Sequence, residues 1–331
     1  MENYTFIEPL LDESNDRVSL LPMINPDMWL SYKKEEAAIW HASEIKIEQD
    51  KKDWGHLKPD EQFYIKNVLG FFASSDLIVS DNLAKRFMSE VVPLEAKFFY
   101  GFQLMMENIH SEVYSNLIDG LIDDKKEKEL LFRAVETMEC VKRKADWAKK
   151  WITSNESFAA RLVAFAIVEG IFFSGSFCAI YWLAERNILP GLCKANEFIA
   201  RDEGMHTDFA CLLYNKYIIN KLSDKEFVSI LTEAVDLELY FNIEALPVNL
   251  LGINSDNMVS YIKFCANRLA KQLGHNIVYG DEDEAKNPFM FMEKIALREK
   301  SNFFEEEVGA YSKFDHNKTN NVVDDAYSDL F

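Results

Sequence analysis

Apolar residues recur at helical spacing over most of this chain. From about residue 27 to about residue 310 they return every three or four positions, and alternation of period two never extends beyond a few residues. This pattern predicts an all-α fold. We expect helices at about 27–40, from 59 through 76 and beyond, and at about 94–118, 125–152, 158–186, 192–220, 223–245, 255–273 and 288–298.

Turn and capping residues support several of these boundaries. The segment Lys58-Pro59-Asp60-Glu61 is typical of a helix start, because proline is tolerated at the first helical position. Asp119-Gly120 predicts the end of the helix that begins near residue 94. Leu189-Pro190-Gly191 predicts a turn between two long helices.

The two ends of the chain differ from its middle. Residues 1–26 contain three prolines and several acidic residues with little periodicity, which predicts an irregular arm. Residues 311–331 are polar and rich in Asn and Asp, which predicts a tail that is disordered until it is bound. We therefore expect one helical domain over 27–310, flanked by the arm and the tail.

One apolar stretch, 162–184, is long enough to span a bilayer. Its single formal charge, Glu169, lies near the middle, where a carboxylate would be costly in lipid. Its flanks also lack the Lys/Arg bias of a membrane protein. We expect the central helix of a large helical bundle and no membrane insertion.

Composition narrows the possible partners and the compartment. The chain has 36 basic and 55 acidic residues, a formal charge of −19, which disfavours binding to nucleic acid. Its five cysteines are scattered without metal-type spacing, and the polar N-terminus lacks a signal peptide. These features predict a reducing, cytoplasmic location.

Two Glu-x-x-His motifs carry the chemistry that the sequence suggests most strongly. Residues three apart project from the same face of a helix, so each pair can offer an oxygen and an imidazole nitrogen to one metal ion. Each motif also follows, by about 30 residues, a carboxylate set among apolar residues. Such an arrangement is typical of the two-metal site of ferritin-like bundles. The six predicted ligands are Asp76, Glu107, His110, Glu169, Glu203 and His206.

The residue types at this predicted site favour iron. Four carboxylates and two imidazoles, without a thiolate, suit iron or manganese better than copper or structural zinc. Four carboxylates also balance the charge of two divalent ions. The alternative is a set of hydrogen-bonded polar groups in the core without a metal, although burying them without partners would cost several kcal/mol.

Aromatic residues near the motifs suggest a redox role. Tyr114 lies four residues beyond His110, on the same helix face, and a tyrosine beside an oxidising metal pair can lose an electron and a proton. Phe173 and Phe177, four and eight residues beyond Glu169, could exclude water from that oxidant. On periodicity alone, ordinary core packing explains Tyr114 equally well, and an aromatic stripe such as Phe173 and Phe177 is more often ordinary core.

Long segments around these residues resemble a known family. They are YKKEEAAIWHASEI (32–45), FFASSD (71–76), FYGFQLMMENIHSEVYS (99–115), AFAIVEGIFFSGSF (164–177) and ARDEGMHTDFACLL (200–213). The chain closely resembles the radical-generating small subunit of class I ribonucleotide reductase, of the iron-tyrosyl type found in eukaryotes and their large DNA viruses. The resemblance covers about residues 22–311.

The resemblance implies a role for each motif position. Asp76, Glu107 and His110 would bind one iron and Glu169, Glu203 and His206 the other, in an oxo-bridged di-iron centre. Tyr114 would store the radical, inside a pocket formed by Phe173, Phe177 and Ile199. Trp40, Asp202 and His110 resemble the hydrogen-bonded chain through which the radical leaves. Tyr311 resembles the relay tyrosine of the tail.

The resemblance also implies partners. The protein would be a homodimer that receives electrons for iron reduction from a donor. It would dock on the large catalytic subunit through a tail that ends at Phe331. The reaction would be the reduction of ribonucleoside diphosphates on that large subunit. A ferritin-like oxygenase or desaturase, and an iron-storage or inactive partner, are the alternative functions.

Overall fold

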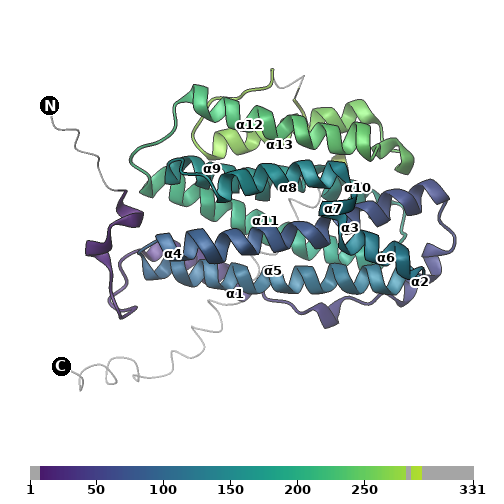
Figure 1. Cartoon of the computed structure of the whole chain (residues 1–331), viewed down its shortest axis with the longest axis horizontal. Helices are drawn as coiled ribbons and strands as arrows, with labels where there is room; N and C mark the ends of the chain where they lie inside the picture. Colours follow the sequence, from purple (N-terminus) through teal and green to yellow (C-terminus); the bar gives the residue numbers. More distant parts are fainter. Residues whose placement is uncertain (1–7, 281–284, 293–331) are drawn as a thin grey trace. The chain divides into compact units, whose positions relative to one another are not determined.

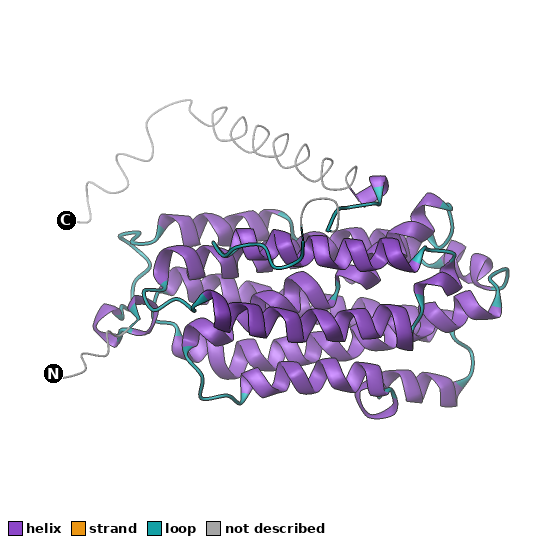
Figure 2. Cartoon of the chain, turned by 90° about the horizontal axis from the view of Figure 1, so that it is seen from above, coloured by secondary structure: helices purple, strands orange, loops and turns teal. Residues whose placement is uncertain are grey.

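A computed structural model describes residues 8–280 and 285–292 of the chain, which form helices and loops with no strand among them (Figure 2). The predicted all-α, ferritin-like class is confirmed. The α-helices are α1 (Pro26–Ala37), α2 (Glu48–Trp54), α3 (Pro59–Asn82), α4 (Met88–Glu90), α5 (Leu94–Leu121), α6 (Lys125–Phe132), α7 (Ala134–Thr137), α8 (Glu139–Ile152), α9 (Phe158–Ile167), α10 (Ser174–Glu185), α11 (Pro190–Tyr217), α12 (Asp224–Leu239) and α13 (Ser255–Gln272).

The described part of the chain also contains π-helical and 3₁₀ turns. The π-helical turns are η4 (Leu83–Phe87), η5 (Val168–Phe172) and η6 (Tyr240–Ala245). The 3₁₀ turns are η1 (Pro9–Leu11), η2 (Glu13–Asn15), η3 (Ala42–Glu44) and η7 (Val248–Leu251).

Long helices packed side by side position the candidate site (Figure 1). Helix α5 packs against α3 and α1, and α11 packs against α9 and α10. Helices α12 and α13 cover the segment between α9 and α10. The chain divides into a unit formed by Met1–Pro288 and a second unit formed by Phe289–Phe331. The predicted helix 288–298 lies mostly outside the described residues, as does the predicted domain boundary near residue 310.

The predicted helix at 158–186 is interrupted. It forms α9 and α10, separated by the π-helical turn η5, which carries Glu169. No proline marks this interruption, and Gly170 and Ser174-Gly175-Ser176 did not by themselves place a break in the predicted helix. In the same way, the predicted helix 125–152 forms α6, α7 and α8, and the predicted helix 223–245 ends in the π-helical turn η6.

Two helix boundaries predicted from glycine and proline differ in the structure. Helix α5 continues through Gly120, where a Cβ atom would lie 2.3 Å from Ile47 Cδ1, so this glycine permits a close contact and does not end the helix. Helix α11 begins at Pro190, after Leu189 with a φ of 53°. Its first free N–H groups donate to the Asp50 carboxylate at 2.8 and 2.7 Å, which fixes the start of this helix.

The apolar stretch at the centre of the chain lies in the core. Among the described residues, Phe158–Glu185 is the segment long and apolar enough to cross a membrane by composition. However, 94% of its most apolar window is buried inside the protein. This burial is what the central helix of a large bundle requires.

Candidate metal centre

Four buried side chains from three elements converge at one point. Glu107 comes from α5, Glu169 from η5, and Glu203 and His206 from α11; one ligand atom from each lies within 4.8 Å of the others. Glu203 and His206 reach the same point because they are three residues apart on a helix. The arrangement gives a cation several oxygen donors and a nitrogen donor.

His110 and His206 both face these carboxylates through Nδ1. His110 Nδ1 lies 3.2 Å from Glu203 Oε1 and 3.5 Å from Glu107 Oε2. His206 Nδ1 lies 2.9 Å from Glu203 Oε2 and 3.3 Å from Glu107 Oε1. Asp76 belongs to α3, and its side chain is outside the part that the structure describes.

A further carboxylate contacts Nε2 of each imidazole, the nitrogen that points away from the four converging groups. His110 Nε2 lies 3.0 Å from Asp202 Oδ2, and His206 Nε2 lies 2.8 Å from Glu35 Oε1. A carboxylate at Nε2 favours the tautomer that carries its proton there, which leaves the Nδ1 lone pair free for a metal ion. The pattern is that of metal-binding histidines oriented by outer carboxylates.

Burial and the crowding of charges shift the pKa values of these groups. Burial, reinforced by the neighbouring carboxylates Glu203 and Glu107, raises the pKa of Glu169 well above its usual value. Burial alone would lower the pKa of each imidazole, but the surrounding carboxylates outweigh it and raise the pKa of both His110 and His206. Glu169 and the two imidazoles by themselves therefore favour bound protons, which a cation would displace. At Glu203, in contrast, the effect of burial is outweighed by the imidazoles, which lower the pKa of its carboxyl group and keep it ionised.

Unsatisfied polar atoms test whether a metal fits this site. Among the described residues, Glu107 Oε1, Glu169 Oε2 and His110 Nδ1 are buried without a hydrogen-bond partner. Leaving such groups unpaired is costly, and a cation would pair all three at once. The donor set of oxygens and imidazole nitrogens fits iron or manganese.

Tyr114 is buried next to an aromatic cluster. This tyrosine is 1% exposed, and Phe72 of α3 stacks on its ring at a centroid distance of 4.7 Å. Phe72 in turn contacts Phe177 at 5.4 Å and Phe173 at 6.0 Å. Ile199 is buried on α11, four residues before Glu203. The phenol ring of Tyr114 therefore packs against Phe72 and is almost wholly buried.

Trp40, Asp202 and His110 form a connected chain of hydrogen bonds. Trp40 Nε1 donates to Asp202 Oδ2 at 2.7 Å, and the same oxygen contacts His110 Nε2. Arg201 donates to the other oxygen, Asp202 Oδ1, at 3.0 and 3.2 Å. The chain thus links the candidate metal centre to an indole that lies beyond the end of α1.

Sequence reasoning missed three residues of the site. Glu35 holds His206, Gln103 Nε2 donates to Glu169 Oε1 at 3.0 Å, and Phe72 covers Tyr114. Periodicity offered a signal for two of them. Glu35 lies seven residues after the buried Met28 on one face of α1, and Gln103 precedes Glu107 by one turn of α5. Two further predicted residues, Tyr311 and Phe331, lie outside the described part of the chain.

Comparison with known proteins identifies the family. The family model for "Ribonucleotide reductase, small chain" matches residues 17–288. The chain belongs to this family. It is 53% identical over 306 residues to a ribonucleoside-diphosphate reductase small chain from Trypanosoma brucei brucei, a match that covers 92% of this chain and 90% of that protein. It is 52% identical over 307 residues to the small chain from Variola virus, covering 93% and 95%.

A solved structure agrees with this assignment. The ribonucleotide reductase Rnr4 homodimer from Saccharomyces cerevisiae superposes with a TM-score of 0.79 at 39% identity, covering 92% of this chain and 93% of that one. The predicted resemblance and enzyme class are confirmed: the chain acts as the small subunit of a ribonucleoside-diphosphate reductase, an oxidoreductase that depends on a metal and works with a large subunit. The alternative functions, an oxygenase or a storage protein, are not supported.

Proposed function

We propose that this small subunit holds two iron ions in the candidate metal centre and uses them to make a radical on Tyr114. Asp76, Glu107 and His110 would hold one ion. Glu169, Glu203 and His206 would hold the other. The unpaired buried atoms and the two inward-facing Nδ1 atoms support this assignment, and the donor set of carboxylate oxygens and imidazole nitrogens fits iron.

The protein's own groups would then control the radical. Two iron ions at this site would, with dioxygen, supply the oxidising power that removes an electron from a nearby phenol. Tyr114 is buried on the helix that carries Glu107 and His110, which places an oxidisable ring next to the site. Phe72, together with the predicted pocket residues Phe173, Phe177 and Ile199, would protect the radical from water and reductants.

Trp40 and Asp202 would carry the radical away from the site. Asp202 accepts a hydrogen bond from Trp40 and contacts His110, so a proton and an electron could move together along this chain. In this proposal Tyr311 relays the radical from the tail to the large subunit, where ribonucleoside diphosphates are reduced.

The proposal includes an assembly. Two copies would form a homodimer, as in the yeast Rnr4 structure, and the tail ending at Phe331 would dock on the large subunit. An electron donor would reduce the iron before oxygen arrives. The reaction would take place in the cytoplasm, without direct contact with nucleic acid or membrane.

The single observation that carries this proposal is the buried Tyr114 one turn of α5 beyond His110, which belongs to a cluster in which both imidazoles turn Nδ1 toward carboxylates. The variant Tyr114→Phe tests it by electron paramagnetic resonance after iron loading in air. We expect the same iron content as the unmodified chain but no tyrosyl radical signal. Tyr100→Phe is the matched control, because Tyr100 is another buried tyrosine of α5. A signal that survives in Tyr114→Phe, or disappears only in Tyr100→Phe, would contradict the proposal.

A further inference from the structure

A buried ion pair lies behind the π-helical turn that carries Glu169. Lys144 of α8 and Glu238 of α12 form this pair, and their side chains are 2% and 0% exposed. Neither residue contacts the four converging groups of the candidate metal centre. An ion pair this deeply buried contributes little net stability compared with apolar residues of the same volume, so its position is better explained by what else it binds.

Each member of the pair bonds to the backbone at the interruption between α9 and α10. Lys144 Nζ donates to the carbonyl oxygen of Phe172 at 2.8 Å. Glu238 Oε1 accepts from the Gly175 N–H at 3.0 Å. In an uninterrupted α-helix this N–H would donate to the carbonyl of Ile171, which here accepts from Ser174 Oγ at 2.7 Å. Side chains therefore replace helical hydrogen bonds at this point.

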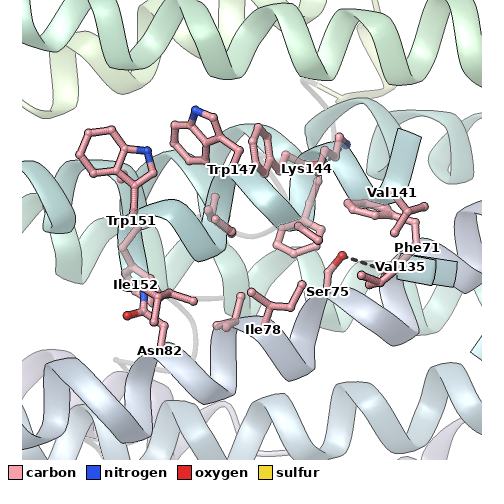
Figure 3. A pocket seen from close by; sticks show the side chains of 18 residues that line it. Phe71, Ser75, Ile78, Asn82, Val135, Val141, Lys144, Trp147, Trp151 and Ile152 are labelled. Atoms are coloured by element: carbon pink, nitrogen blue, oxygen red, sulfur yellow. Dashed lines mark hydrogen bonds between the residues drawn. The ribbon is translucent and has the colours of Figure 1, made fainter. Parts of the chain in front are cut away.

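The surroundings of Lys144 are mostly apolar. It lies at one end of an apolar cavity between α3 and α8, beside Val141 and Phe71 (Figure 3). Ser75, which also lines this cavity, already donates to the Phe71 carbonyl at 2.7 Å. The ammonium group of Lys144 also lies 4.2 Å from the ring centroid of Phe71 and 3.9 Å from that of Phe241, where cation–π attraction adds to the ion pair.

The Glu238 side of the interruption is equally specific. Asn242 Nδ2 donates to Glu238 Oε1 at 2.8 Å and to the Glu238 carbonyl at 3.0 Å. A Cβ atom on Gly175 would lie 2.5 Å from Asn242 Nδ2, so only glycine allows this approach. The π-helical turn η6, which contains Asn242, therefore packs directly against the start of α10.

We propose that Lys144 and Glu238 are positioning residues that hold η5 in its π-helical form and thereby aim Glu169 and Phe173 at the metal and radical sites. Glu169 is the second residue of η5, and Phe173 follows its last residue. A regular helix through this segment would rotate both side chains relative to α9, because a π-helical turn contains one more residue than an α-helical turn. The functional part of this inference rests on the function proposed above; the conformational part does not.

Two variants separate the members of the pair. Lys144→Met keeps a long side chain but removes the donor to Phe172. Glu238→Gln keeps an acceptor for Gly175 but removes the negative charge. The matched control is Glu90→Gln, which breaks the ion pair between Glu90 and Arg161 at the start of α9, away from η5.

Hydrogen–deuterium exchange on the full chain, before any metal is added, tests the conformational part. We expect Lys144→Met and Glu238→Gln to speed exchange in 168–178 more than in 158–167, whereas Glu90→Gln should not. Unchanged exchange over 168–178 in the folded variants would overturn the proposal. If Lys144→Met does not fold, exchange over 168–178 in the isosteric variant Glu238→Gln tests the proposal instead.

Calorimetric titration with Mn²⁺ tests the functional part. We expect both variants to weaken one of two binding events by at least about 10-fold, the lower end of the range for residues that support metal ligands. Affinity equal to that of Glu90→Gln would overturn the positioning role. If the unmodified chain binds no Mn²⁺, the proposed function fails, and the exchange experiment still reports on the ion pair alone.

Discussion

Glu35 provides a direct test of the outer carboxylates, because it was not among the site residues predicted from the sequence. It is 1% exposed, and its Oε1 contacts His206 Nε2 at 2.8 Å. In the variant Glu35→Ala the imidazole loses the group that fixes its tautomer and orientation. Loss of such an outer partner typically lowers metal affinity by about 10–100-fold, which corresponds to about 1.4–2.7 kcal/mol. We expect one of the two metal-binding events to weaken by this amount.

The stability of the protein before metal is added should change much less. Burial raises the pKa of the Glu35 carboxyl group, and Oε2 is without a hydrogen-bond partner among the described residues. Removing this carboxylate therefore relieves a burial cost. It also leaves the His206 Nε2–H without an acceptor, which costs about 1–3 kcal/mol. The two effects oppose each other, so affinity and stability can be separated.

The assay is an anaerobic titration with Fe²⁺ or Mn²⁺ in which calorimetry measures the binding. Thermal unfolding is measured on the same samples. Glu35→Gln should lose less affinity than Glu35→Ala, because its amide oxygen can still accept from Nε2. Glu36→Ala is the matched control, since that carboxylate lies next along α1 but is 38% exposed and pairs with Lys33. Unchanged affinity in Glu35→Ala, or an equal loss in Glu36→Ala, would refute the reasoning.

Three further predictions concern other parts of the chain. Asp202→Asn should keep iron and the radical signal but lower turnover with the large subunit by at least about 10-fold, since a hydrogen bond to a charged group is worth about 1.5–3 kcal/mol; turnover equal to that of the unmodified chain would contradict this. Deleting residues 325–331 should leave the radical intact and abolish turnover in a reductase assay, and an unaffected rate would argue against tail docking. Burial opposes ionisation of Glu95, but Arg17 and backbone N–H groups hold its pKa down at about 2. Its ionised form therefore stabilises the fold above pH of about 4.5, and this contribution is lost as pH falls toward 2. Glu95→Gln should lower Tm at pH 7, and the difference from the unmodified chain should shrink on acidification; a difference independent of pH would exclude this ion pair as the cause.

The sequence was sufficient to predict the fold class and the convergence of the helical motifs. Glu203 and His206 share a helix face by spacing alone, and their apolar neighbours require that both be buried. Trp40 and Asp202 entered only through resemblance, since 162 residues separate the two partners of their hydrogen bond. Spacing carries information along one helix, but it does not determine which helices meet.

The interruption at η5 was not predictable for a related reason. Residues 162–184 are apolar apart from Glu169 and two serines, and the local pattern favours one continuous helix. At the interruption, the Phe172 carbonyl is bonded by Lys144, 28 residues earlier in the chain. The Gly175 N–H is bonded by Glu238, 63 residues later. A π-helical turn stabilised by distant side chains leaves no periodic signal in its own segment.

The two outer carboxylates differ in a way that bears on how the site works. Asp202 accepts hydrogen bonds from Trp40 and Arg201 in addition to its contact with His110, so its charge is shared among several donors. Glu35 contacts His206 through Oε1, its Oε2 has no hydrogen-bond partner among the described residues, and burial raises the pKa of its carboxyl group. A carboxylate with one partner can exchange a proton with that partner at little cost elsewhere. A change in the charge of Asp202, in contrast, directly alters its hydrogen bond with the Trp40 indole. In the function proposed above, coupling between the metal centre and the proposed route through Trp40 should therefore run through His110, and the His206 side should adjust its protonation without disturbing that route.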